Sequence, residues 1–185
     1  MIRIILISAV LLIGCKKPND RSCWKGAGKT DSEIRELPNK TLINIFDDAD
    51  VILIQDSLNY IEVESYSNLV SLIETNSIDT AIEIRNLNRC NFIRDRDIEN
   101  RVTIHYSSIE ILNLYGTGKV TFMGEIIQNN LEINSYDSRS EFTLNISCHR
   151  LECSFIEGSV NANISGSSDS TYIYQSKHSI VNASN

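Results

Sequence analysis

The chain has 185 residues, of which 42% are hydrophobic and 22% charged, with a formal net charge of −7 and two prolines. An acidic surface of this kind disfavours nucleic acid and anionic lipid headgroups as partners, because both repel negative charge. The length predicts one domain with enough apolar residues for a core.

The N-terminus has the anatomy of a secretory signal. Arg3 precedes about ten apolar residues, and small Gly14 precedes Cys15, a stretch too short for a membrane-spanning helix. The segment Leu11–Cys15 resembles a bacterial lipobox. We therefore expect residues 1–14 to be a cleaved lipoprotein signal peptide and Cys15 to carry acyl chains; an ordinary cleaved signal with an unmodified cysteine is the alternative. Losing Arg3 leaves a formal net charge of −8.

The residues after Cys15 are polar and lack apolar periodicity. They predict a lipidated flexible tether over residues 15–36, with no regular structure up to about Leu37. The predicted location is the cell envelope, anchored to the outer membrane by lipid. The periplasmic face and the cell surface both stay open at this point.

Five cysteines would fit a disulfide framework in an exported protein. With Cys15 assigned to lipid, Cys23, Cys90, Cys148 and Cys153 remain at irregular positions. Cys148 and Cys153 could bridge neighbouring strands, but buried free thiols are the favoured interpretation. The absence of a Cys-x-x-Cys spacing argues against a zinc site.

From Leu42 onward, short runs alternate apolar with polar residues, which is the period-two pattern of strands. The segment from Tyr66 to Glu74 is the one helix candidate and predicts a turn or two at most. The fold class is therefore all-β. The predicted strands are Val51–Gln55, Tyr60–Glu64, Ala81–Leu87, Val102–Tyr106 and Ile109–Leu114.

The C-terminal part repeats itself with a period of about 20 residues, which indicates a solenoid whose repeats bury their apolar faces by stacking. Three segments fall in register: Ile109–Ile111, Leu131–Ile133 and Leu151–Cys153. Further apolar positions align at Val120, Phe142 and Ala162, and at Phe122, Leu144 and Ile164. Because the turns are rich in Asn, Asp, Ser and Gly, a parallel β-helix fits better than a sandwich. Gly116, Gly118, Gly158 and Gly166 are read as turn glycines.

Several of these segments together resemble the DUF2807 family, also called the putative auto-transporter adhesin, head GIN domain, which is typical of lipoproteins from the Bacteroidetes. The resemblance spans about Leu37 to Asn185. Its most specific element is Cys90–Arg94, followed by the strand Val102–Ile104 and the Gly-x-Gly turn at Gly116–Gly118. The other matching segments are Val51–Gln55 and Val63–Thr75.

The resemblance implies a right-handed parallel β-helix-like solenoid of short stacked strands, without an established enzyme activity. Two departures stand out: Asp137–Ser140 replaces an expected glycine turn, and the chain stops at Asn185 without the Tyr-x-Gly closing segment of the family. We therefore expect the domain, residues 37–185, to be truncated at its C-terminal end, with an apolar interior exposed there.

Candidate chemistry is sparse. His105, His149 and His178 lie at irregular distances and read as structural, and no Gly-x-Ser-x-Gly elbow exists. Polysaccharide-cleaving β-helices need clustered carboxylates. One acidic cluster, beside a predicted turn, consists of Asp47, Asp48 and Asp50. A second segment alternates two acidic residues, Asp95 and Asp97, with Arg94 and Arg96. We read this segment as a solvated loop, and a patch that contacts a glycan or a protein is the alternative. The phenylalanines at 92, 122, 142 and 155 read as core, whereas Tyr172 and Tyr174 share an exposed face.

These observations predict a non-catalytic cell-envelope lipoprotein, an adhesin-like binding or structural module without cofactor or metal. The expected partners are the membrane, through the lipid anchor at Cys15, and a glycan or protein ligand. A glycan-active β-helix enzyme is the alternative, and a convergent carboxylate site on one face would favour it.

Overall fold

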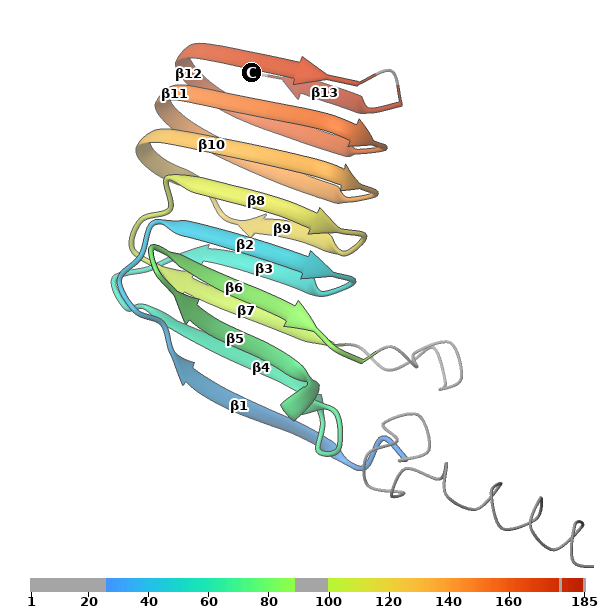
Figure 1. Ribbon diagram of the computed structural model, residues 1–185. Helices are drawn as coiled ribbons and strands as arrows, with labels where there is room; N and C mark the ends of the chain where they lie inside the picture. The colour runs from blue at the N-terminus through green and yellow to red at the C-terminus, as the bar shows by residue number, and fades with distance from the viewer. Residues whose placement is uncertain (1–25, 89–99, 177, 185) are drawn as a thin grey trace, which may run out of the picture.

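The computed structural model describes residues 26–88, 100–176 and 178–184. Within these residues all thirteen strands belong to one hydrogen-bonded, curled sheet, and the helical content is one 3₁₀ turn at Val70–Leu72. Figure 1 shows the strands stacked as successive layers from β1 at one end to β12 and β13 at the other. The strands are β1 Thr30–Glu36, β2 Leu42–Asp47, β3 Asp50–Gln55, β4 Tyr60–Tyr66, β5 Ile73–Ile78, β6 Ala81–Asn86, β7 Arg101–Tyr106, β8 Ile111–Gly116, β9 Lys119–Met123, β10 Ile126–Ser138, β11 Glu141–Gly158, β12 Asn161–Gln175 and β13 Ile180–Ser184.

The sheet runs along one side of the molecule and returns along the other. One side has the order β1-β4-β7-β3-β9 and the other the order β8-β2-β6-β5, while the long strands β10 and β11 join them. From β8 to β13 all pairings are parallel, and residues about 20 positions apart lie beside each other, as Leu131 lies beside Leu151. This pairing confirms the predicted repeat of about 20 residues.

The N-terminal half departs from a purely parallel arrangement. Strand β4 pairs antiparallel with β1 and β7, and β5 pairs antiparallel with β6. The layer formed by β2 and β3 lies between the β6–β7 and β8–β9 layers, although β6 and β7 follow it in sequence. The expectation of parallel strands throughout is therefore wrong here, because alternation of apolar residues predicts strands but not their partners or direction.

The core fills the space between the two sides with alternate residues of each strand. Val120, Phe142 and Ala162 follow one another on neighbouring strands and are all buried. Phe122, Leu144 and Ile164 are buried as well. The rings of Phe142 and Phe155 meet at 5.5 Å between centroids with a 55° tilt, a favourable arrangement of aromatic pairs. Both were predicted to be core residues, and Phe92 lies outside the described residues.

Strand β1 occupies residues for which the sequence predicted a flexible tether. Its side chains are largely exposed, Ile34 to 71%, so alternation gave no signal. The strand forms because its backbone pairs with β4 from Thr30↔Tyr66 to Glu36↔Tyr60. Arg35 adds hydrogen bonds to the carbonyl oxygens of Val70 at 3.2 Å and Ile73 at 2.5 Å, across the end of the stack.

The predicted register is right for β10 and β11 but wrong by one residue for β8. Leu131 pairs with Leu151 and Ile133 with Cys153, as expected. Ile133, however, pairs with Leu112 rather than Ile111. Ile109 and Leu112 are both buried while Glu110 is exposed, so an extra residue enters the chain at the start of β8 and shifts its pairing.

Tight turns stack on one another at the edge opposite the long bends. A Cβ on Gly116 would lie 1.7 Å from the carbonyl oxygen of Asp47, and one on Gly118 would lie 2.0 Å from that of Ala49. Gly116 and Gly118 are thus needed for close approach of backbones. Gly158 ends β11 with φ 75°, whereas Gly166 lies inside β12 rather than in a turn. The Asp47–Asp50 cluster lies at this turn, where Asp50 accepts a hydrogen bond from the Lys119 N–H.

Candidate functional site

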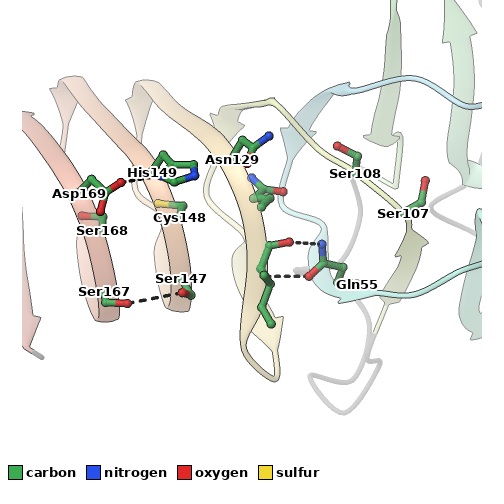
Figure 2. A pocket seen from close by; sticks show the side chains of 12 residues that line it. Gln55, Ser107, Ser108, Asn129, Ser147, Cys148, His149, Ser167, Ser168 and Asp169 are labelled. Carbon is green, nitrogen blue, oxygen red and sulfur yellow. Dashed lines mark hydrogen bonds and ion pairs between the residues drawn. The ribbon is translucent and has the colours of Figure 1, made fainter.

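A polar groove of about 640 Å³ lies where the long strands bend from one side of the molecule to the other. Figure 2 shows the stacked bends of β10, β11 and β12 with the end of β3 and the β7–β8 connection beside them. We call this the corner groove. It is lined by Gln55, Ser107, Ser108, Ile127, Gln128, Asn129, Ser147, Cys148, His149, Ser167, Ser168 and Asp169.

The repeat places the lining residues in columns. Parallel pairing sets Ile127 beside Ser147 and Ser147 beside Ser167, and likewise Gln128 beside Cys148 and Cys148 beside Ser168. The hydroxyls of Ser147 and Ser167 are 3.5 Å apart. Two residues further along the same two strands, His149 Nδ1 contacts Asp169 Oδ2 (Figure 2). The repeat therefore supplies the part of the groove that is built from β10, β11 and β12.

Gln55 fixes the N-terminal end of the groove. Its carboxamide donates to the Ile127 carbonyl at 2.9 Å and accepts from the Ile127 N–H at 2.9 Å (Figure 2). The side chain thus pairs with β10 as a strand backbone would. Gln128 donates to the Asn130 carbonyl at 2.8 Å, and its Oε1 is buried without a hydrogen-bond partner in the described residues.

Cys148 sits in the groove as a half-buried thiol. Burial, with a smaller contribution from the nearby Asp169 carboxylate, raises the pKa of the Cys148 thiol. A reactive cysteine needs the opposite shift, because the thiolate is the nucleophile. Cys148 and Cys153 are both free and lie on β11, so the alternative of a disulfide between them is wrong. Cys15, Cys23 and Cys90 lie outside the described residues.

The sequence matches, over residues 41–185, the family described as putative auto-transporter adhesin, head GIN domain. The chain belongs to this DUF2807 family. The resemblance read from the sequence is thereby confirmed. Among curated proteins, none matches the chain.

Solved structures resemble this GIN domain in fold. A putative adhesin from Parabacteroides distasonis has a TM-score of 0.63 at 16% identity, covering 78% of this chain and 60% of that one. A putative adhesin from Bacteroides fragilis has a TM-score of 0.61 at 14% identity, covering 83% and 73%. A putative lipid binding protein from Parabacteroides distasonis has a TM-score of 0.53 at 16% identity, covering 84% and 77%. The GIN domain chain thus spans 60% of the length of the first of these.

The histidines of the GIN domain do not converge. His105 stacks on Tyr60 at 4.1 Å between ring centroids, and its Nδ1 lies 3.2 Å from Asp56 Oδ2. His149 belongs to the corner groove, and the His178 carbonyl accepts from Ser159. Within the described residues, no group of three or more His, Cys, Asp and Glu side chains is placed to hold a metal ion. The Asp95, Asp97, Arg94 and Arg96 patch lies outside the described residues.

A row of carboxylates crosses the outer face of the GIN domain beside a shallow cleft of about 480 Å³. Glu110 accepts from Thr41 at 3.3 Å, Glu132 from Asn134 at 2.7 Å and Glu152 from Arg150 at 2.8 Å. Each carboxylate therefore has its own neighbour. A general acid and base pair requires two carboxylates facing one reacting bond, whereas each carboxylate of this row accepts a hydrogen bond from a neighbouring side chain.

An aromatic ladder on the same face was not found from the sequence. Tyr115 stacks between Phe46 at 4.8 Å and Tyr136 at 5.0 Å, and the Arg85 guanidinium covers the far face of Phe46 at 3.7 Å. Because the rings cover one another's faces, the ladder stabilises neighbouring strands. Tyr172 and Tyr174 are exposed as predicted, to 55% and 66%. The spacing of Tyr115 and Tyr136, about one repeat, could have indicated that these two rings stack. The sequence could not indicate the third ring, Phe46, because it reaches them through the unexpected pairing of β2 with β8.

No helix in the described residues is long and apolar enough to cross a membrane. The segment Leu11–Cys15, which resembles a lipobox, lies outside those residues.

Proposed function

We propose that this chain is a non-catalytic cell-envelope lipoprotein whose GIN domain binds a ligand in the corner groove. The observation that carries the proposal is the lining of that groove, in which neutral hydroxyl and amide side chains predominate. Ligand sites combine a concave shape with a few convergent polar groups. The adhesin names of similar structures agree with a binding role.

One feature of the groove supports binding over catalysis: its thiol has a raised pKa, which disfavours the nucleophilic thiolate. A glycan-active enzyme, the alternative, would need a convergent carboxylate pair, and the carboxylates of the outer face are each bound by a neighbour.

The lipobox supports anchoring through Cys15, with residues 1–14 removed and the rest of the chain held at the outer membrane by acyl chains. For the fold, the parallel pairing from β8 to β13 supports a β-helix-like solenoid over this part of the chain, for which we propose the right-handed form that the family resemblance implies.

Protease treatment of intact cells tests the anchoring and the adhesin-like role together. Wild type should fractionate with the membrane, and Cys15→Ser should be released. Loss of the C-terminal domain on protease treatment would agree with an adhesin-like role at the surface, whereas full protection would contradict it. Reducing-end assays on polysaccharides test the enzyme alternative, and a product that accumulates with time would refute the non-catalytic role.

A further inference from the structure

We infer that the ligand of the corner groove is a neutral saccharide, an inference that rests on the binding function proposed above. Three properties of the groove carry it: its hydrogen-bonding groups without an internal partner, the absence of Lys and Arg from its described lining, and its size.

The groove offers both donors and acceptors that the fold does not use. In the described part of the chain, the side chains of Ser107, Ser108 and Asn129 have no hydrogen-bond partner, and all three are exposed. They lie on the side of the groove toward the β7–β8 connection (Figure 2). The buried Gln128 Oε1 adds an acceptor without a donor. Sugar hydroxyls both donate and accept, so they satisfy a mixed set of this kind.

The charge of the groove favours an uncharged ligand. Neither Lys nor Arg is among its described lining residues, so phosphate, sulfate and uronate groups would find no cation to pair with. Its one carboxylate, Asp169, is engaged by His149. An amine on the ligand would compete with the His149 ring for that carboxylate, and the neutral members of the glycan class fit best.

The size and apolar content of the groove distinguish a saccharide from a protein. The volume of about 640 Å³ falls within the range of sites for small ligands. Protein interfaces are anchored by buried aromatic residues and Arg, and the described lining has neither. Its one large apolar side chain, Ile127, is 68% exposed and can contact the C–H face of a sugar ring.

Glycan binding by the full-length protein tests the inference. The probes are maltohexaose, laminarihexaose and chitohexaose as neutral glycans, with heparin as a polyanion and hexameric chitosan as a polycation, alongside an array of extracellular proteins. The test variant is Ser107→Ala with Asn129→Ala, whose side chains make no internal hydrogen bonds. The matched control is Ser154→Ala with Asn161→Ala, which removes the same groups outside the groove.

We expect wild type and control to bind at least one neutral hexasaccharide equally, and the test variant to bind about tenfold more weakly, as for the loss of two neutral hydrogen bonds. Binding to heparin or chitosan alone, or equal binding by the test variant, overturns the inference. Binding to a protein through the same side chains overturns the inference that the ligand is a saccharide but agrees with the proposed binding function. A wild type that binds no probe of either kind contradicts both.

Discussion

Replacing Gly116 by alanine tests the stacking of tight turns that sets the spacing of the layers. The added Cβ would lie 1.7 Å from the carbonyl oxygen of Asp47 and within 2.8 Å of its nitrogen. Both are backbone atoms, so no flexible side chain can move aside. The β8–β9 and β2–β3 turns would have to separate substantially, because real Cβ contacts shorter than 3.0 Å are essentially never seen.

We expect this forced separation to destabilise the protein by about 1–3 kcal/mol, the usual cost of overpacking. Alanine restricts the unfolded chain more than glycine does, which offsets less than about 1 kcal/mol. For a domain of this size the melting temperature should fall by roughly 2–4 °C for each kcal/mol. Thermal unfolding followed by circular dichroism measures the shift.

Gly26→Ala is the matched control, because a Cβ there would meet nothing within 4 Å. Its melting temperature should equal that of the wild type. If Gly116→Ala also melts with the wild type, the close turn-to-turn contact, and with it the position of β2–β3 against β8–β9, would be refuted.

Three further predictions concern the core, pH and thiols. Phe142→Ala should cost about 3–5 kcal/mol in urea unfolding, because a fully buried ring is lost; a cost below about 1 kcal/mol would contradict its packing. The Ser57 N–H and then His105 lower the pKa of Asp56 below 3.8. The ionised Asp56 carboxylate should therefore stabilise the fold above about pH 4, and this stabilisation should be lost as the pH falls through the lowered pKa of the folded state. In Asp56→Asn, the melting temperature should accordingly fall less steeply with decreasing pH than in the wild type. Burial raises the pKa of Cys153 to about 12, and mass spectrometry after iodoacetamide treatment at about pH 8 should find Cys153 unmodified until the protein unfolds.

The sequence predicts strands wherever alternation is local and one face is buried. The strand predicted at Ile109–Leu114, which the structure has at Ile111–Gly116, and the repeats that follow were found in this way, because residues about one repeat apart pair with each other. The positions of β6 and β7 in the sheet were not predicted. The pairing of Leu42 with Ala81 does not follow the repeat, so no periodicity in the sequence indicates it. Strand β1 was missed since backbone hydrogen bonds, rather than buried side chains, hold it.

The corner groove carries no motif, yet its columns were present in the repeat. His149 and Asp169, and Ser147 and Ser167, are each 20 residues apart, and aligning the repeats would have placed them together. The contributions of Gln55 and Ser107 could not be found, because they come from layers whose order the sequence does not indicate.

Capture of vesicles on beads coated with a neutral hexasaccharide tests anchoring and groove binding in one measurement. The vesicles carry the lipidated full-length protein. We predict that the wild type attaches to vesicles and holds them on the beads, that Cys15→Ser does not attach, and that Ser107→Ala with Asn129→Ala attaches but does not hold the vesicles. Attachment of Cys15→Ser, or undiminished capture by the groove variant, would contradict this prediction.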